Sequence, residues 1–285
     1  MNTQTDTLRQ WVTERATTPW RASEDPIVVV AGAKGGLGTS TTAALMALTA
    51  AERGRRTLLI DTDAHVGTIH RWFGLDAPRS IADFARGDCS VDEAALHLAD
   101  GLFLLPGGPG TCRAPGLTAN DRRALHRRLS AVTPRFDLTI IDAGAQLEAL
   151  VAAGTVGVRR LIAVGNVDPV ALAASFALLK AADARWPGIP VEWLVPRHEE
   201  ARARRAFDHL QLGSARFLGR ELVFAGTIPE DSDLESRLAA GHTLPGAAIG
   251  TAALTAADTI TRRTLAELDD VTRRSILPRT YARSS

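Results

Sequence analysis

The sequence predicts an α/β protein, with a doubly wound, mainly parallel sheet and helices on both faces. Two observations predict this class. Seven short runs rich in Val, Ile and Leu alternate along the chain with longer stretches rich in Ala and Leu. Most of the short runs are apolar along their length rather than alternating in polarity, which is typical of parallel strands covered by helices on both sides. A repeated strand–helix order builds such a sheet and places ligands at the carboxyl ends of its strands.

The elements follow one another without an internal repeat or a low-complexity tract. The predicted strands are residues 27–32, 57–61, 102–106, 136–142, 160–166, 191–195 and 222–229. The predicted helices between and after them are residues 39–53, 118–132, 168–185, 199–211 and 247–270. We expect three parts: a short helix and Pro-containing linker over 1–24, one large domain over 25–270, and a tail over 271–285.

Composition excludes several classes of protein. The 285 residues carry a net charge of +1, which argues against a strong general attraction to nucleic acid, and we expect no specific nucleic-acid partner. No apolar run reaches about 18 residues, the length of a membrane span. Asp6 and Glu14 interrupt the first residues, so no secretory signal is expected. Cys89 and Cys112 form no Cys-x-x-Cys pattern and predict neither zinc nor a disulfide scaffold. A cytoplasmic enzyme or switch protein is the expectation.

A glycine-rich loop connects the first predicted strand to the first long helix. Glycines let successive N–H groups turn toward a phosphate, and the helix N-terminus adds positive potential. Ser40 falls where P-loop proteins place their Mg²⁺ ligand, although Ala33 replaces the first glycine of G-x-x-x-x-G-K-[ST] and Thr39 replaces its lysine. A turn without a ligand is the alternative. The predicted nucleotide-binding residues are Lys34, Gly35, Gly36, Leu37, Gly38, Thr39, Ser40 and Thr41.

Acidic residues stand at the ends of two other predicted strands. The strand 57–61 ends in Asp61 and is followed two residues later by Asp63, and the strand 136–142 ends in Asp142. Carboxylates at this edge of a sheet can hold Mg²⁺ and orient an attacking water. An Asx turn after the strand is the alternative reading of the first pair. The small-residue loop after Asp142 is where a nucleotide-sensing switch is expected.

These motifs together resemble the MinD/ParA group of deviant Walker A ATPases. The resemblance rests on the loop around Lys34, the stretch 51–63, Ile140–Asp142 and the late segment 226–231, and it covers roughly residues 26–270. It implies ATP and Mg²⁺ as cofactors and an ATP-dependent homodimer. By the same resemblance, Lys34 would reach the partner's phosphates and Ser40 would bind Mg²⁺. Asp61 would support the metal, Asp63 would position the attacking water, and Asp142 would be the Walker B carboxylate.

Within this group the chain is most similar to the flagellar-number regulators of the FlhG/FleN type. The likeness includes Pro106-Gly107-Gly108, the helix segment 176–180 with the second lysine of the chain, and a partial match over residues 4–9. It implies that residues 1–15 dock an SRP-type GTPase or a flagellar or pilus component. The C-terminal stretch 262–283 carries six arginines and is either an amphipathic membrane-surface helix or a plain packing helix.

Three departures from the group keep alternatives open. Thr39 lacks the lysine ammonium, Gln146 stands where a glycine is usual, and Val195-Pro196-Arg197 replaces a segment that often carries an adenine-reading Asn. Pilus-assembly proteins of the TadZ/CpaE type also lack the loop lysine, so a weakly hydrolysing or non-hydrolysing localisation scaffold is the alternative to a slow ATPase. A ParA-type partitioning role ranks below both.

Overall fold

The computed structural model describes residues 26–63, 67–108, 117–145 and 157–276. The predicted N-terminal helix and linker, Gln146 and the last residues of the predicted tail therefore lie outside the described residues. Within the described part, no helix is long and apolar enough to cross a membrane.

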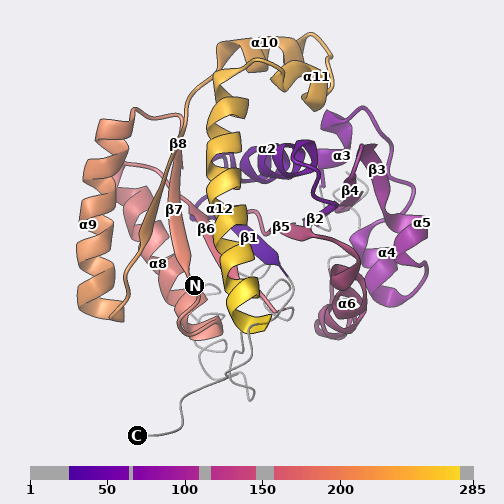
Figure 1. The fold of residues 1–285 in the computed structure, drawn as a ribbon, viewed down its shortest axis with the longest axis horizontal. Helices are drawn as coiled ribbons and strands as arrows, with labels where there is room; N and C mark the ends of the chain where they lie inside the picture. Colours follow the sequence, from indigo (N-terminus) through magenta and orange to yellow (C-terminus); the bar gives the residue numbers. More distant parts are fainter. Residues whose placement is uncertain (1–25, 64–66, 109–116, 146–156, 277–285) are drawn as a thin grey trace, which may run out of the picture.

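An eight-stranded sheet forms the centre of the molecule (Figure 1). Its strand order is β3-β4-β2-β5-β1-β6-β7-β8, and every neighbouring pair is parallel except β3 and β4. The strands are β1 (Ile27–Gly32), β2 (Thr57–Asp61), β3 (Leu96–Ala99), β4 (Leu102–Leu105), β5 (Leu138–Asp142), β6 (Arg160–Val164), β7 (Val191–Pro196) and β8 (Val223–Ile228). The predicted doubly wound, mainly parallel sheet is confirmed.

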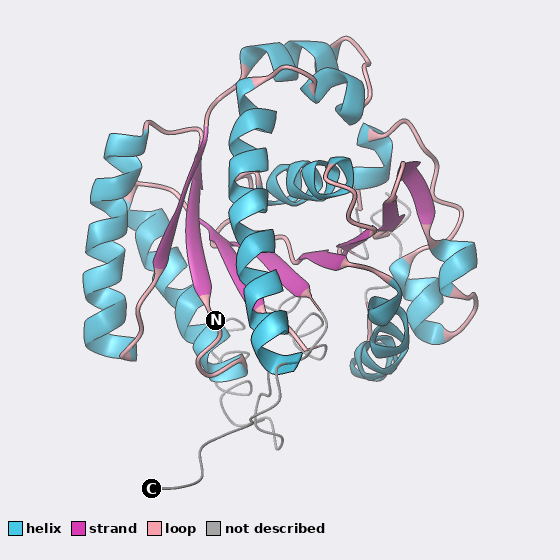
Figure 2. Ribbon diagram, in the orientation of Figure 1, coloured by secondary structure: helices cyan, strands magenta, loops and turns pink. Residues whose placement is uncertain are grey.

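Helices cover both faces of the sheet (Figure 2). One apolar core lies between the sheet and α2 (Thr39–Glu52), α3 (Ile69–Trp72), α10 (Ser232–Ala239), α11 (Leu244–Ala248) and α12 (Ala252–Ile276). The other core lies under α4 (Ile81–Arg86), α5 (Val91–Ala94), α6 (Ala119–Val132), α8 (Pro169–Arg185) and α9 (Glu200–Leu218). A 3-10 turn, Thr133–Arg135, follows α6. Strands such as β1 are buried at every residue because both faces are covered.

The seven predicted strands are all present, and the structure adds an eighth. β3 has four residues, lies at the sheet edge and is only half buried, so it lacks the long apolar run that marks the other strands. It pairs with β4 in antiparallel register, from Leu96 opposite Leu104 to Ala99 opposite Leu102. A short connection of this kind closes a hairpin, which the strand–helix alternation did not predict.

Two of the predicted helices have different boundaries. α9 continues to Leu218, seven residues beyond the predicted end, and ends at Gly219, whose φ of +61° is the usual left-handed C-terminal cap. The predicted helix 247–270 is wrong at its start: α11 ends at Ala248 and α12 begins at Ala252, with Gly250 between them at a φ of +74°. α12 also runs without a break past residue 270, the predicted domain boundary, to Ile276.

Candidate functional site

The glycine-rich loop turns directly from β1 into α2. Gly36 and Gly38 have φ values of +79° and +83°, which residues with a Cβ rarely adopt. The first helical hydrogen bond runs from the N–H of Thr42 to the carbonyl of Gly38, 2.8 Å away. A hollow of about 170 Å³ lies above the loop, lined by Lys34, Gly35, Gly36, Gly38, Thr39, Ser40, Thr41, Gly144 and Ala145. Seven of the eight predicted nucleotide-binding residues thus lie around one hollow.

The eighth, Leu37, turns its side chain away and packs against the apolar core beneath α2. Lys34 is exposed at the rim of the hollow. The second lysine, Lys180, is exposed on α8 and lines neither this hollow nor the neighbouring pocket.

Thr39 occupies the place of the usual loop lysine with a short, buried side chain. It is only 6% exposed. A Cβ built on Gly32 would lie 2.3 Å from the Thr39 hydroxyl oxygen, so this close approach requires glycine at the end of β1. The N–H of Gly32 donates to the carbonyl of Gly144 over 2.7 Å, which ties the loop to the segment after β5. The site therefore offers a hydroxyl but no ammonium at this position.

The predicted metal and Walker B residues meet at the carboxyl ends of β2 and β5. Asp61 and Asp142 are register partners on these adjacent parallel strands. The Ser40 hydroxyl donates to the Asp142 carboxylate, and the N–H of Gly144 donates to Asp142 Oδ1 over 2.9 Å. The N–H of Asp63 donates to Asp61 Oδ1 over 3.0 Å. Three segments far apart in the sequence thus bring one hydroxyl and two carboxylates together.

Burial raises the pKa of both strand-end carboxylates. Asp61 and Asp142 are each 3% exposed. Desolvation, reinforced by repulsion from Asp142 and Asp63, raises the pKa of Asp61 to about 7, although N–H groups of Asp63 and Ile69 oppose the rise. Desolvation also raises the pKa of Asp142, against its hydrogen bonds from Ser40 and Gly144. A divalent cation would neutralise this pair.

The donor set fits Mg²⁺ rather than a softer metal. Mg²⁺ is usually held by one or two carboxylates together with substrate phosphates and water. The described residues contain no group of three or more His, Cys, Asp or Glu side chains that could hold a metal by themselves. A Ser hydroxyl and two carboxylates beside an anion-binding loop match an ion that arrives with a nucleotide.

A close contact that the sequence did not predict positions Asp61 and Asp63: the glycines after Pro106 lie directly against them. The loop after β4 passes against them, and the N–H of Gly108 donates to the Asp63 carbonyl over 2.6 Å. A Cβ on Gly107 would lie 2.3 Å from that carbonyl oxygen and 2.9 Å from Asp61 Cγ. The only signal in the sequence was the consecutive glycines after Pro106. Asp63 itself is exposed and close enough to Asp61 and Asp142 to raise the pKa of both.

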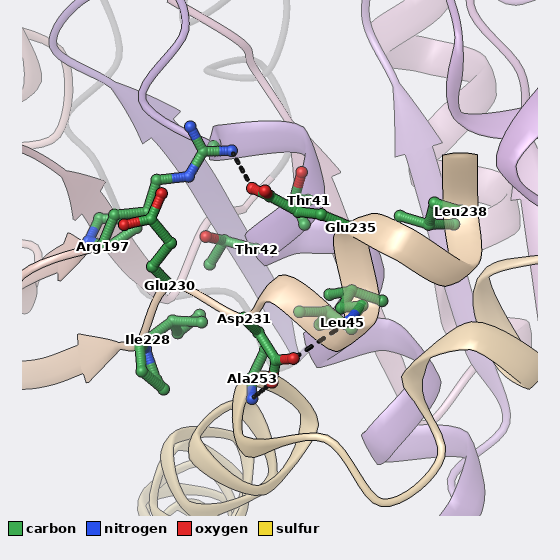
Figure 3. Close-up of a pocket in the computed structure, with 14 residues that line it drawn as sticks. Thr41, Thr42, Leu45, Arg197, Ile228, Glu230, Asp231, Glu235, Leu238 and Ala253 are labelled. Atoms are coloured by element: carbon green, nitrogen blue, oxygen red, sulfur yellow. Dashed lines mark hydrogen bonds and ion pairs between the residues drawn. The ribbon is translucent and has the colours of Figure 1, made fainter. Parts of the chain in front are cut away.

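A narrower pocket lies beside the loop (Figure 3). Its lining comes from α2, from the ends of β7 and β8, and from α10 and α12: Gly38, Thr41, Thr42, Leu45, Pro196, Arg197, Ile228, Pro229, Glu230, Asp231, Leu234, Glu235, Leu238 and Ala253. Asp231 fixes one wall, because its two oxygens accept from the N–H groups of Leu234 (3.1 Å) and Ala253 (2.9 Å). The sequence indicated only the segments 195–197 and 226–231.

The sheet order, the loop and the paired carboxylates define a P-loop protein of the MinD/ParA type. The family model described as "AAA domain" matches residues 25–182. The chain belongs to this family, as a MinD/ParA-type P-loop ATPase close to the FleN/FlhG proteins. The resemblance inferred from the motifs is confirmed.

Individual relatives agree with this assignment. The chain is 25% identical to the antiactivator FleN of Pseudomonas aeruginosa over 210 residues, which cover 73% of this chain and 75% of FleN. It is 32% identical to the chromosome-partitioning ATPase Soj of Thermus thermophilus over 123 residues, 43% of this chain and 47% of Soj. The solved structure of the septum site-determining protein MinD from Pyrococcus horikoshii, complexed with Mg-ADP, shares the fold. Its TM-score is 0.67 at 19% identity, with 87% of this chain and 98% of that chain covered.

Proposed function

We propose that this protein is a nucleotide-switched ATPase that dimerises with ATP, returns to monomers after hydrolysis, and regulates the number or placement of flagella or of another surface machine. The observation that carries the proposal is the meeting of Ser40, Asp61 and Asp142 beside a phosphate-sized, glycine-lined hollow. The similarity to FleN, a protein named as an antiactivator, and to the flagellum site-determining protein YlxH of Helicobacter pylori supports the regulatory part.

The residues around the hollow suit a Mg²⁺–ATP complex. Loop N–H groups and the N-terminus of α2 would bind the phosphates. Ser40 and Asp61 would hold the ion, with Asp142 accepting from Ser40 and fixing its hydroxyl. When bound, Mg²⁺ supplies positive charge to the β- and γ-phosphate oxygens. Asp63, exposed at the edge of the site, would orient the attacking water.

Lys34 is proposed to act across the dimer. It is exposed at the rim of the hollow, and no carboxylate in the described part of the chain forms an ion pair with it. Its ammonium is therefore available to the phosphates of a nucleotide held by a second copy. A charge-assisted contact of this kind is strong where water is excluded.

Buried Thr39 favours slow turnover and supports a second candidate function. Without an ammonium at this position, one electrostatic donor to the transferring phosphoryl group is lost, which costs on the order of 3 kcal/mol. The alternative is a TadZ/CpaE-like scaffold that binds nucleotide and localises a pilus machine without much hydrolysis. The nucleotide would then control assembly rather than be consumed.

Two further contacts are proposed from the resemblance. Residues 1–15 would dock the machine or its GTPase, and the C-terminal tail, 271–285, would touch the inner face of the membrane. A deletion of residues 1–15 should leave the melting temperature within a few degrees and remove stimulation by a partner. A large loss of stability would show that this segment belongs to the core.

Phosphate release from Mg²⁺–ATP tests the enzymatic proposal. We expect slow turnover by the wild-type protein and none by Asp63→Ala, with ATP binding retained in both. Binding without release in both proteins would favour the scaffold. A protein that binds no nucleotide at all would refute both candidate functions.

A further inference from the structure

The segment after β2 and the loop after β4 cross at the edge of the phosphate site, backbone against backbone. A Cβ built on Gly67 would lie 2.6 Å from Gly107 Cα and 2.8 Å from the amide nitrogen of Gly108. A Cβ built on Gly107 would lie 2.3 Å from the Asp63 carbonyl oxygen. All three glycines are buried. Cβ atoms do not approach backbone atoms so closely, so Gly67 and Gly107 can carry no side chain.

The requirement for glycine at this crossing comes from space and not from backbone conformation. Neither Gly67 nor Gly107 has a positive φ, unlike Gly36 and Gly38 in the phosphate loop. An alanine at either position would therefore meet no backbone strain of its own. Only the neighbouring backbone excludes it. The two glycines thus set how closely the segment after β2 and the loop after β4 approach each other.

Asp63 is the residue that this crossing holds in place. The N–H of Gly108 donates to the Asp63 carbonyl over 2.6 Å, and the N–H of Asp63 donates to Asp61 Oδ1 over 3.0 Å. On the other side, the N–H and the hydroxyl of Thr62 both donate to the carbonyl of Asp142, over 3.1 and 2.7 Å. Both backbone polar groups of Asp63 are therefore bonded, which fixes the point from which its side chain starts.

The loop after β4 is itself tied to the domain, so it is a firm support for Asp63. The carbonyl of Pro106 accepts from the N–H of Ile81 over 2.7 Å, at the start of α4. Ile81 is fully buried, and the side chain of Ser80 caps the same helix. The loop cannot move away without the start of α4. Bulk added at the crossing would therefore displace the segment that carries Asp63.

We propose that Gly67 and Gly107 are positioning residues for nucleotide hydrolysis, which hold the backbone of Asp63 where its carboxylate orients the attacking water. The proposal rests on the ATPase function proposed above and deepens it, because the two glycines act through Asp63 and not on the nucleotide. Neither glycine lines the phosphate hollow or the pocket beside it. Their effect is therefore on the rate of hydrolysis and not on the binding of ATP.

Phosphate release at saturating Mg²⁺–ATP, together with the affinity for ATP, tests this proposal in the whole chain. The decisive variant is Gly67→Ala, because its Cβ would meet only glycine backbone. Release should slow about tenfold to a hundredfold, as expected when a reacting group is misplaced by about 1 Å. The affinity for ATP should change less than threefold. Gly107→Ala should slow release as much and should also need more Mg²⁺, because its Cβ would lie 2.9 Å from the Asp61 carboxylate.

The matched control is Gly246→Ala, at an exposed position of α11 where a Cβ would lie 3.9 Å from its nearest neighbour, the Thr243 hydroxyl. It should leave release and affinity unchanged. Melting temperatures show that the variants fold, and Gly67→Ala decides the question by itself if Gly107→Ala does not fold.

Two results would overturn the positioning role while leaving the ATPase function intact. One is release by Gly67→Ala at the wild-type rate. The other is an equal loss of release and of ATP affinity in this variant, which would show that the crossing supports the fold as a whole. A wild-type protein that binds ATP but releases no phosphate would overturn the ATPase function and the positioning role together.

Discussion

Asp61 is ionised at neutral pH in an unfolded chain but resists ionisation in the folded one. Its pKa rises from 3.8 to about 7 on folding, first because it is buried and second because Asp142 lies beside it. At pH values well below 3.8 the carboxyl is protonated in both states. As the pH rises toward 7, the unfolded state ionises while the folded state does not, so stability is lost over this range.

Asp61→Asn should therefore stabilise the metal-free protein in a pH-dependent manner. The amide keeps an oxygen for the N–H of Asp63 and removes the charge. The difference in free energy of unfolding between Asp61→Asn and wild type should grow by about 2–3 kcal/mol from pH 5 to pH 8, because only the wild type loses stability over this range. Urea unfolding in EDTA at both pH values measures this difference. The same variant should lose the stabilisation that Mg²⁺ and ATP give the wild-type protein. An advantage that does not change with pH would contradict this account of Asp61.

Thr39→Lys should restore the missing positive charge. Thr39 lines the hollow above the loop, so a lysine at this position would place its ammonium beside the bound phosphates. We expect tighter binding of Mg²⁺–ATP and faster phosphate release, by up to about a hundredfold. Phosphate release is measured for both proteins side by side, with Asp63→Ala as the blank. Wild-type turnover already equal to that of the variant would mean that another group replaces the ammonium.

Individual site residues differ in how far the sequence could predict them. Ser40, Asp61 and Asp142 could be predicted to meet. Asp61 and Asp142 end recognisable strands, Ser40 lies in the first turn of the helix after another, and the carboxyl ends of parallel strands share one sheet edge. For Gly107 the sequence marked only the segment. Its close approach to Asp61 and Asp63 is set by packing between distant segments rather than by a local pattern.

At the scale of elements, α12 is held to the sheet by a network of charges around a buried carboxylate. Glu192 on β7 is fully buried and accepts from Arg160 (2.6 Å) and from Arg263 of α12. Arg160 also pairs with Glu267 of α12. In the sequence, the acidic residues of this helix dilute the basic face that a membrane-surface helix needs. In the structure Glu267 pairs with Arg160 and Asp269 pairs with Arg55, so this part of α12 packs on the domain.

Glu192→Ala should destabilise the protein strongly. It leaves the guanidinium of Arg160 buried with less compensation and removes the link to Arg263, and breaking a buried pair costs about 3–5 kcal/mol. The matched control is Asp258→Ala, which removes a pair between α12 and Arg53 that is about one-third exposed. That change should cost about 1 kcal/mol or less. Urea unfolding measures both, and equal losses would contradict the structural role of Glu192.

The strands that the sequence predicted each have a run of apolar residues that is long enough to recognise without the structure. The strands β1, β2 and β5 are rich in Val, Ile and Leu and are buried at every residue, because both faces of the sheet are covered. The short helices α4 and α5 were missed, although Ser80 and Ser90 each begin a capping box with an acidic residue three positions later. Four to six residues give too few turns for an apolar stripe, so only the capping residues mark them.

For the whole molecule, the strand order decides where the site lies. β1 lies between β5 and β6, and the sheet extends through β5, β2 and β4 on one side and through β6, β7 and β8 on the other. In a doubly wound sheet, the crevice at this point binds the ligand. The hollow above the loop opens at the same edge, with Lys34 exposed on its rim. One face of the protein therefore carries both the phosphate site and the residue proposed to act on a second copy.

Lys34→Ala should abolish ATP-induced dimerisation while leaving nucleotide binding measurable. The loop N–H groups and Ser40 would still hold the nucleotide within one subunit, but the charge that crosses to the partner's phosphates would be gone. The chain provides its own control, because Lys180 is the other lysine and lies exposed on α8. Lys180→Ala should dimerise as the wild type does. Light scattering, with Asp63→Ala in the background to prevent hydrolysis, measures the mass with and without Mg²⁺–ATP. If Lys34→Ala doubled its mass as fully as the control, the dimer would not depend on this lysine, and the switch would have to act through another part of the same face.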